Sequence, residues 1–530
     1  MPVAVSYPGV YIEELSSGVH AITGVATAIT AFVGRALRGP TDADPESPVI
    51  VNSFADFERV FGGLWLYSAM SFAVRDFFAN QGSQAVIVRL FHAKIGGRDK
   101  AELQAATLNL TAAYPGKWGN KLRVRIDHHT RDLEPGEAPD SLFNLTVRDG
   151  NTGTSEVFRN VTHIADLPNS LDKVLENQSR LVRVRLPLPG ARPNAHAAPP
   201  AGQDIWGDNS SASTKVVAGG EADDGDLLDQ SNFAGVEAAK TGIYSLLKTD
   251  LFNLLCVQPY KSDGDADPAV ITDAAALCER RRAFLIVDSP TAWRDTATAL
   301  AGAGNFSANL GTASRNAAVF FPRLRRPNPE RGDQLEDFAP CGAIAGVFAR
   351  TDATRGVWKA PAGLEASING APAFSVPLTD AENGGLNPLG VNCLRTLPGA
   401  GQVVWGSRTL RGADRLGDTD WKYIPVRRLA LFLEESLYRG TQWAVFEPND
   451  EPLWAQFRLN IGAFMHGLFR QGAFAGQTPR DAYFVKCDRE TTTPNDVNLG
   501  IVNVLIGFAP LKPAEFVILR FQQMAGQIAT

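Results

Sequence analysis

The hydrophobic residues near the end of the chain are spaced as in a β-strand. The segment AEFVILRFQQMAGQIAT spans residues 514–530. Side chains of a strand alternate between its two faces. The pattern therefore places Phe516, Ile518 and Arg520 on one face, and Val517, Leu519 and Phe521 on the other. A last strand that is apolar on both faces needs cover, either within its own domain or in another chain.

The start of the chain shows a similar pattern. Residues 3–15, VAVSYPGVYIEEL, alternate roughly between apolar and polar positions, and Pro8-Gly9 interrupts them. This pattern predicts extended backbone well before the first helix. Both ends of the chain are therefore predicted to be strands that need a sheet.

Residues 21–95 contain an αβ unit with clear local signals. Ser53 can cap a helix across FADFERVFGG, and Gly62-Gly63 can end it. A second helix is predicted across SAMSFAVRDFFAN, and the apolar run AVIVRL at 85–90 predicts a buried strand.

The pattern changes at about residue 96. KLRVRIDHH, SLFNLTVRDG, SEVFRNVT and SRLVRVRLP are short alternating segments separated by turn residues. They predict an antiparallel, β-rich module. The module ends in residues 187–226, which are rich in Pro, Gly, Ala, Ser and Asp. Such a composition buries too little apolar area to offset its ordering cost, so we expect an exposed, mobile loop.

The second half of the chain returns to longer elements. Residues 232–336 alternate apolar strands, such as LFNLLCVQPY and RRAFLIVDSP, with the helical segment PAVITDAAALCERRR. A helix is predicted across VRRLALFLEESLYRG. A longer helix follows Asn449, which can cap it, and Trp454, Phe457, Ile461, Phe464 and Leu468 form its apolar stripe. DAYFVKCD, IVNVLIGFAP and AEFVILRF predict three terminal strands.

Charge and cysteine content narrow the class of protein. The net charge is −6 and the pI is near 5.8. This argues against nucleic acid or an anionic membrane as the main partner, because both select basic surfaces. No apolar run approaches the roughly 18 residues that a membrane helix needs. The five cysteines are far apart and form no C-x-x-C motif, so we expect reduced, buried thiols.

Motifs for catalysis or cofactor binding are mostly absent. The chain has no P-loop sequence and no G-x-S-x-G. Gly399-Ala-Gly401 starts like a dinucleotide fingerprint, but Val404 stands where the third glycine belongs, and a strand rather than a helix is predicted to follow. His128-His129 are expected to point to opposite faces of an edge strand, which does not suit one metal ion. Asp288 ends the apolar run FLIVD, where either a turn or a catalytic carboxylate is plausible.

Two charged pairs on the first long C-terminal helix can be interpreted in two ways. They are Arg427-Arg428 and Glu434-Glu435. Such pairs commonly form a solvated face, but they can also bind an oppositely charged partner.

Several stretches of the chain resemble contractile tail sheath proteins. They are SRNAAVFFPRL, AGVFARTDATRGVWKAPAG, LNPLGVNCLRTLPGAGQVVWGSRTL, WKYIPVRRLALFLEESLYRGTQWAVFEPNDEPLW, DAYFVKCD and APLKPAEFVILRF. Together they cover most of residues 314–521 in the expected order. PGVYIEEL, the αβ unit up to residue 91 and AYPGKWGNKLRV fit the same family, whereas loop 187–226 has no counterpart.

The resemblance implies an α+β multidomain fold. A discontinuous inner α/β domain would be built from both chain ends, residues 21–95 and 337–513. A β-rich outer domain, 96–231, and an α/β outer domain, 232–336, would be inserted into it. Residues 1–20 and 514–530 would form extended terminal arms.

The resemblance also implies a structural role. Many copies of such proteins stack as a helical sleeve around an inner tube, and contraction of the sleeve drives the tube through a target envelope. The implied partners are further copies of the chain, the inner tube protein, and baseplate and terminator (cap) proteins, without direct nucleic-acid contact or membrane insertion. The particle, a phage tail or contractile injection system, would be assembled in the bacterial cytoplasm. The family offers no catalytic residue, metal site or cofactor to transfer.

The terminal arms of this family add strands to neighbouring subunits. The residues expected to do so here are Val3, Val5, Tyr7, Phe516, Val517, Ile518, Leu519, Arg520 and Phe521. We also predict that the helices around 425–470 face the tube, with Arg427, Arg428, Glu434 and Glu435 as contacts.

Two other functions are compatible with the sequence. One is an α/β enzyme that uses residues 232–336, with Asp288 near the strand ends. The other is the subunit of a non-contractile filament, which would form polymers of a single diameter without an inner tube.

Overall fold

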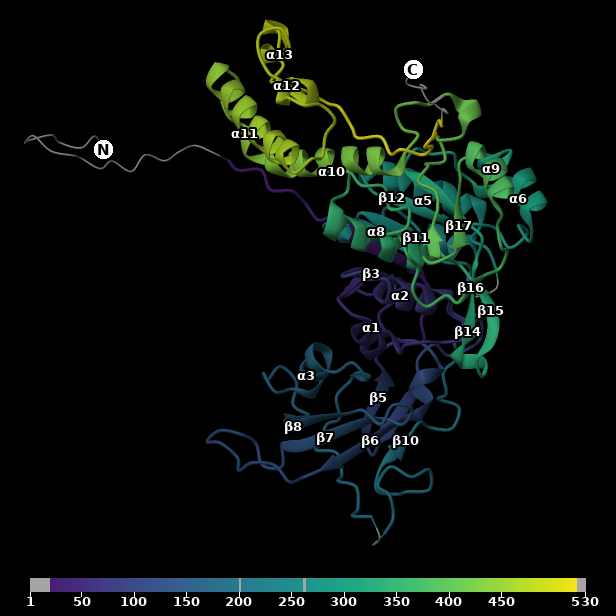
Figure 1. Cartoon of the computed structure of the whole chain (residues 1–530). Coiled ribbons are helices and arrows are strands. Elements are labelled where there is room, and N and C mark those ends of the chain that lie inside the picture. Colours follow the sequence, from purple (N-terminus) through teal and green to yellow (C-terminus); the bar gives the residue numbers. More distant parts are fainter. Residues whose placement is uncertain (1–19, 200–201, 261–263, 522–530) are drawn as a thin grey trace, which may run out of the picture. The chain divides into compact units, whose positions relative to one another are not determined.

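The computed structural model describes residues 20–199, 202–260 and 264–521. The chain divides into two compact units, and one of the boundaries between them falls within helix α8 (Cys341–Arg355). The large unit comprises residues 28–350 and 362–418, and the small unit comprises residues 1–27, 351–361 and 419–530. Figure 1 shows the elements of both units in sequence colours.

An eight-stranded sheet forms the centre of the large unit. Its order is β18-β17-β13-β12-β11-β1-β3-β2. The strands are β1 (Thr30–Gly34), β2 (Val49–Val51), β3 (Ala85–Arg89), β11 (Leu254–Val257), β12 (Phe284–Asp288), β13 (Ala317–Phe321), β17 (Val391–Leu397) and β18 (Gly401–Val404). The six inner strands run parallel, whereas β2 and β18 pair antiparallel at the two edges. The inner strands are apolar runs because helices cover both faces of a parallel sheet.

This sheet corrects the predicted domain boundaries. Residues 21–95 and 232–336 were expected to lie in separate domains. In the structure Phe32 of β1 has Ile87 of β3 on one side and Cys256 of β11 on the other. The two segments therefore share one sheet and one core, to which residues 391–404 also belong.

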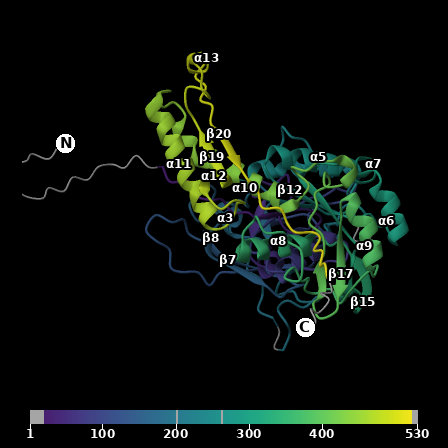
Figure 2. The ribbon, with the colours of Figure 1, turned by 45° about the horizontal axis from the view of Figure 1, so that its top comes forward.

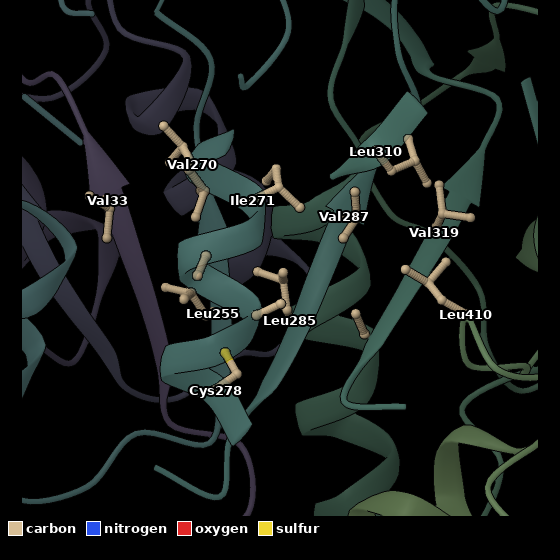
Figure 3. Packing of buried hydrophobic residues seen from close by; sticks show 14 of the residues in the cluster. Val33, Leu255, Val270, Ile271, Cys278, Leu285, Val287, Leu310, Val319 and Leu410 are labelled. Atoms are coloured by element: carbon tan, nitrogen blue, oxygen red, sulfur yellow. The ribbon is translucent and has the colours of Figure 1, made fainter. Parts of the chain in front are cut away.

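Helices pack on the sheet through their apolar faces. They are α1 (Phe54–Phe61), α2 (Ala69–Ala79), α4 (Gln230–Ala234), α5 (Pro268–Arg280), α6 (Thr296–Ala303), α7 (Phe306–Leu310), α8 and α9 (Asp380–Leu386). Figure 3 shows side chains of α5, among them Val270 and Ile271, gathered with Leu255 and Leu285 of the strands. The predicted start of α1 is confirmed, since the Ser53 side chain accepts a hydrogen bond from the backbone N–H of Asp56.

A β-rich module with its own core is inserted into the large unit after β3. One sheet has the order β10-β6-β7-β8 and another has the order β4-β5-β9. The strands are β4 (Glu102–Ala105), β5 (Leu108–Ala112), β6 (Leu122–Asp127), β7 (Leu142–Asp149), β8 (Ser155–Thr162), β9 (Val182–Val184) and β10 (Thr214–Lys215), with helix α3 (Leu171–Gln178). The predicted antiparallel character is confirmed, and Phe143, Leu145 and Val147 are among the buried side chains.

Part of segment 187–226 belongs to this module, so the expectation of a wholly exposed loop was wrong. Ala212, Val216 and Ala222 are buried, and β10 pairs with β6. The ring of His196 connects two segments, because its Nδ1 accepts from the backbone N–H of Ile126 at 3.0 Å and its Nε2 lies 2.8 Å from the Thr214 hydroxyl. Hydrogen bonds thus anchor a segment that is poor in large apolar side chains.

A small three-stranded sheet completes the large unit. It has the order β15-β14-β16 and consists of β14 (Leu324–Asn328), β15 (Gln334–Phe338) and β16 (Ala373–Phe374). Arg326 of β14 is buried, pairs with Asp76 of α2, and lies over the ring of Phe338 at 4.3 Å.

The small unit is built on two long helices and a two-stranded sheet. Its elements are α10 (Ile424–Gly440), α11 (Glu451–Arg470), α12 (Pro479–Ala482), β19 (Tyr483–Lys486), α13 (Pro494–Asn498) and β20 (Leu505–Phe508). The predicted stripe of α11 is buried at Trp454, Phe457, Ile461 and Leu468, whereas Phe464 is only partly buried. The cap is Asp450 rather than Asn449, whose side chain accepts from Trp454 Nε1 instead.

Candidate functional site

The chain after β20 presents a run of exposed apolar side chains. Two hydrogen bonds hold its first residues: Lys512 Nζ donates to the Thr419 carbonyl at 3.2 Å, and the Tyr423 hydroxyl donates to Glu515 Oε2 at 3.3 Å. Beyond them, Phe516, Val517, Ile518, Leu519 and Phe521 have exposed fractions of 74, 79, 76, 73 and 92%. Five neighbouring large apolar side chains in water are unusual and indicate an interaction surface.

This C-terminal segment, residues 514–521, forms no strand in the described chain, contrary to the secondary structure predicted for it. A strand is defined by ladder hydrogen bonds to a neighbour. The described residues of the same chain supply no such neighbour. The expected participants Phe516 to Phe521 are therefore consecutive exposed residues without a partner strand in the described chain, and Arg520 is exposed among them.

The two-stranded sheet of the small unit has unused edges. β19 and β20 pair antiparallel from Tyr483↔Phe508 to Lys486↔Leu505, and no third strand joins them among the described residues. Figure 2 shows the two strands side by side. Phe484 and Leu505 are 52 and 54% exposed. Isolated two-stranded sheets are marginally stable, and unpaired edges bind further strands readily.

The described part of the N-terminal segment lies along α10. The imidazole of His20 stacks on Trp443 with ring centroids 4.2 Å apart. Further on, the backbone N–H of Val25 donates to the Ser436 hydroxyl at 3.2 Å.

Two glycines permit this close approach. A Cβ at Gly440 would lie 2.7 Å from the Ile22 side chain, and one at Gly24 would lie 2.8 Å from the Phe432 ring. Residues 20–27, which we term the N-terminal strap, thus run antiparallel to α10. The expected arm residues Val3, Val5 and Tyr7 lie outside the described residues.

The strap ends beside a buried ion pair, to which Thr27 is hydrogen-bonded. Arg428 donates to both carboxylate oxygens of Asp352, at 2.9 and 2.6 Å, and to the carbonyl of Thr27 at 2.9 Å. The Thr27 hydroxyl donates to the same carboxylate at 2.6 Å. The side chains of Arg428 and Asp352 are only 3 and 5% exposed. A bidentate pair with a further hydrogen bond to each partner offsets the cost of burying both charges.

The charged pairs on α10 do not form the solvated face that their sequence suggested. Arg427, Arg428 and Glu435 are buried, and only Glu434 is exposed. Arg427 donates to Glu434 at 3.1 Å and lies over the ring of Trp421, while Glu435 accepts from Arg439 at 2.7 Å. All four predicted tube contacts are thus paired within their own subunit. Three of them are also buried, because long side chains on a packed helix can be buried when their charges are paired. Asp352, the partner of Arg428, lies far away in sequence and was not predicted.

Asp288 has a structural position that explains its perturbed titration. Its Oδ1 accepts from the backbone N–H of Cys341, the first residue of α8, at 2.8 Å. Burial raises the pKa of the Asp288 carboxyl to about 6, and Arg323 and the hydrogen bonds from Cys341 oppose the rise. The carboxylate therefore caps a helix N-terminus from a neighbouring strand, which is a structural role different from the predicted turn.

The remaining candidates for chemistry have structural roles as well. Gly399 and Ala400 lie in the turn of the β17–β18 hairpin, and Gly401 is the first residue of β18. His128 and His129 follow β6 rather than lying on it, and His128 Nε2 lies 2.9 Å from the Pro193 carbonyl. All five cysteines are buried and free, as expected. Among the described residues, no cluster of His, Cys, Asp and Glu could hold a metal ion, and no helix is long and apolar enough to cross a membrane.

Comparison with protein families assigns most of the second half of the chain. Residues 234–410 match the phage tail sheath protein central domain, and residues 417–524 match the phage tail sheath C-terminal domain. Together the two matches span more than half of the chain. The chain belongs to the phage tail sheath family. The second match includes β19, β20 and the exposed segment 516–521, and the family is one of structural proteins.

Individual relatives extend this assignment. The chain is 29% identical over 299 residues to a putative prophage major tail sheath protein of Pseudomonas aeruginosa (strain UCBPP-PA14), covering 53% of this chain and 69% of the relative. It is 23% identical over 258 residues to the tail sheath protein of Enterobacteria phage T4. That match covers 47% of this chain and only 37% of the phage protein.

Solved structures share the mixed α/β fold over almost the whole chain. The helical sheath of the anti-feeding prophage in its contracted state matches with a TM-score of 0.56 at 25% identity, covering 98% of this chain and all of the other. The sheath complex of the extracellular contractile injection system PVC, also contracted, matches with a TM-score of 0.57 at 22% identity, covering 98 and 99%. A sheath tail protein from Listeria innocua matches with a TM-score of 0.58 at 14% identity, covering 92 and 96%.

Proposed function

We propose that this chain is the repeating subunit of a contractile tail sheath, which polymerises helically around an inner tube and contracts to drive the tube through a target envelope. Membership in the sheath family supports the structural role. The likeness to sheaths solved in contracted states supports contraction. The observation that carries the proposal is the exposed apolar run from Phe516 to Phe521, which suits a second chain rather than water.

The subunits are linked by exchange of terminal strands. In this proposal residues 516–521 of one copy extend the β19–β20 sheet of a neighbour, and the segment with Val3, Val5 and Tyr7 extends the sheet of another. Each new ladder hydrogen bond contributes about 0.5–1.5 kcal/mol net. Each apolar side chain that becomes fully buried contributes about 1.5–3 kcal/mol. Both terms favour pairing over exposure.

Such a linkage produces a filament. The donated segment and the accepting sheet are different surfaces of the chain, so the contact is head-to-tail and leaves a free donor and a free acceptor at each step. The N-terminal strap fixes one arm to α10, and the hydrogen bonds of Lys512 and Glu515 fix the other. Subunits linked through such arms can turn during contraction while the strand pairing persists.

We place the tube contact on the exposed side of the long helices. Glu434 remains accessible on α10, and Ala455, Leu459, Ala463 and His466 lie exposed on α11. They take the place of the buried Arg427, Arg428 and Glu435. Baseplate and terminator (cap) proteins would bind the two ends of the sleeve. The particle, a phage tail or an injection system, would be assembled in the bacterial cytoplasm.

Electron microscopy of deletion variants tests the proposal. The full chain, alone and with its tube protein, is expected to form sleeves in two lengths and widths. Deletion of residues 514–530 should leave a folded monomer that does not polymerise, and so should deletion of residues 1–15. A variant truncated after Phe521 is the matched control, because it retains the apolar run. Unimpaired sleeves from the chain without residues 514–530 would contradict strand exchange, and sleeves of a single diameter would contradict contraction.

A further inference from the structure

The large unit contains a cavity lined by arginines. Its volume is about 540 Å³. The lining residues come from the loop after β12, from the β14–β15 hairpin and from the segment after β16; they are Thr291, Trp293, Arg294, Arg323, Arg325, Arg331, Glu336, Asp337, Phe338 and Ser375. The cavity thus lies beyond the carboxyl ends of β12 and β13, where open α/β sheets commonly bind ligands.

Positive charge dominates the lining. Four arginines face two carboxylates. The buried Arg323 is occupied, because it donates to Asp265 at 2.7 Å and to the Ser289 carbonyl at 3.2 Å. Arg325 binds Asp337 through Nε and Nη2, at 2.7 and 3.0 Å. A guanidinium has five N–H donors, so Arg325 retains donors for a further acceptor.

Among the four arginines of the cavity, Arg294 has the most hydrogen-bond donors available for a ligand. Its side chain is exposed at the rim, and the described residues give its guanidinium no hydrogen bond or ion pair. Arg331 is half exposed and contacts Glu336 at 3.0 Å through Nη1, which leaves its Nη2 available. Planar guanidinium groups around a cavity suit carboxylates or phosphates, which accept paired hydrogen bonds.

An acidic loop elsewhere on the chain has the complementary charge. The loop between β6 and β7 carries four carboxylates and one arginine at residues 131–140: Arg131, Asp132, Glu134, Glu137 and Asp140. Glu137 accepts both Nη groups of Arg131, at 2.8 and 2.6 Å, and Asp140 pairs with Arg192.

Two carboxylates of this loop remain for another partner. Asp132 is exposed, and the described residues give its carboxylate no hydrogen bond or ion pair. Glu134 is 73% exposed, and its nearest approach to Arg131 is a long contact of 3.7 Å. No residue of the loop lines the cavity of the same copy, so a match between the two requires a second copy.

We propose that the arginine cavity binds the acidic loop 131–140 of a second copy of this chain, with Asp132 and Glu134 facing Arg294 and Arg325. This inference rests on the proposed function, because the assembled sleeve supplies the second copy at high effective concentration. The contact joins subunits through the large unit and is independent of the terminal strands.

Charge reversal with rescue tests the proposal in the full chain. Arg294→Glu and Asp132→Lys each remove a group that has no partner within its own copy, so both variants should fold normally. Each should lower the ratio of polymerised to free subunit at moderate salt by about fivefold, the effect of losing an exposed ion pair. The double variant, in which every subunit carries both changes, should recover the wild-type ratio. Arg159→Glu and Glu176→Lys, at exposed sites outside the cavity and the loop, are the matched controls and should leave the ratio unchanged.

The possible results separate this contact from the strand exchange. Failure of the wild-type chain to polymerise would contradict the proposed function, whereas normal sleeves with no effect of either reversal would contradict only the loop contact. Weakening by both single changes without rescue would also overturn it. If citrate or inorganic phosphate binds the free subunit in calorimetry, Arg294→Glu abolishes that binding, and Asp132→Lys has no effect on assembly, the cavity is a small-anion site instead. If Arg294→Glu weakens attachment of the tube protein but not the sleeve, the partner is the tube.

Discussion

The first strand of the large sheet and the last described residues of the chain are similarly apolar but differ in what surrounds them. Every residue of β1, TAFVG, is buried, and the strand has a parallel partner on each side. The run FVILRF at residues 516–521 is largely exposed and has no partner strand in the described chain. Apolar alternation therefore indicates a strand that needs cover, but it does not tell whether that cover lies in the same chain.

The largest difference between the two regions is expected from phenylalanine truncation. Phe32 of β1 is fully buried and lies edge-on to Phe77 at 5.6 Å. Phe32→Ala should lower the free energy of unfolding by about 3–5 kcal/mol, because it leaves a cavity in a packed core. Phe516→Ala should change the stability of the free subunit by no more than about 0.5 kcal/mol but should weaken polymerisation. Urea unfolding and sedimentation of the two variants measure both effects, and a stability loss in Phe516→Ala that equals that of Phe32→Ala would show the segment to be packed in its own subunit.

A second comparison is possible on a single helix. Arg428 and Glu434 lie on α10, one buried in an ion pair and the other 44% exposed. Arg428→Met should lower the free energy of unfolding of the small unit by about 3 kcal/mol, because it leaves the Asp352 carboxylate buried without its cation. Glu434→Gln keeps an acceptor for Arg427 and should keep thermal stability within about 0.5 kcal/mol. Because it removes the exposed charge, it tests the proposed tube contact by co-sedimentation with the tube protein. Equal destabilisation by both changes would contradict the conclusion that Arg428 is needed for stability and Glu434 is not.

Local signals in the sequence predicted the local elements well. Ser53 caps α1 as expected, since capping depends on residues within one turn of each other. The antiparallel β-rich module was also predicted, because its strands follow one another along the chain. The merging of residues 21–95 with 232–336 was missed. The partners Phe32 and Cys256 are separated by the whole module, and such long-range pairing leaves no mark on either segment.

The candidate site was predicted in part for the same reason. The apolar run at 516–521 could be found from its pattern, because a predicted strand with apolar residues on both faces needs cover. The charged residues on α10 were predicted to be available to a partner, but most of them are buried. A helical pattern shows which residues share a face, but it does not show which residues from other elements pair with them. Asp352 pairs with Arg428 only through the tertiary fold. The close approach of the N-terminal strap to α10 at Gly440, which leaves no room for a Cβ, is likewise visible only in the structure.

The pH dependence of stability tests the environment of the buried Asp288 carboxyl in the large unit. Its carboxyl has a pKa of about 6 in the folded chain, against about 4 when unfolded. Between these values the folded chain holds a proton that the unfolded chain has lost, so stability falls as pH rises through that window. Asp288→Asn keeps an acceptor for Cys341 without titrating. It should be more stable than the wild type above pH 6, and the difference should vanish towards pH 4 in urea unfolding.

Asp295 provides a control of opposite sign. Its carboxylate caps α6, and hydrogen bonds from Thr298 lower its pKa. It therefore stabilises the folded chain above about pH 4, and this contribution is lost as pH falls through the lowered pKa. Asp295→Asn should be slightly less stable than the wild type at pH 7 and equal to it at low pH. Parallel pH profiles for the wild type and Asp288→Asn would show that Asp288 does not titrate as described.

The smallest expected effect concerns the N-terminal strap, residues 20–27, which lies against α10. Gly440 of α10 faces Ile22 closely, whereas a Cβ at Gly467 of α11 would meet nothing within 4 Å. Replacing a helical glycine by alanine normally stabilises a protein by up to about 1 kcal/mol. Gly467→Ala should show this gain. Gly440→Ala should show none, because its methyl group pushes the strap away from the helix, and the accompanying loss of the His20 stack should alter Trp443 fluorescence. Equal stabilisation by the two changes, with unchanged fluorescence, would mean that the strap does not lie on α10.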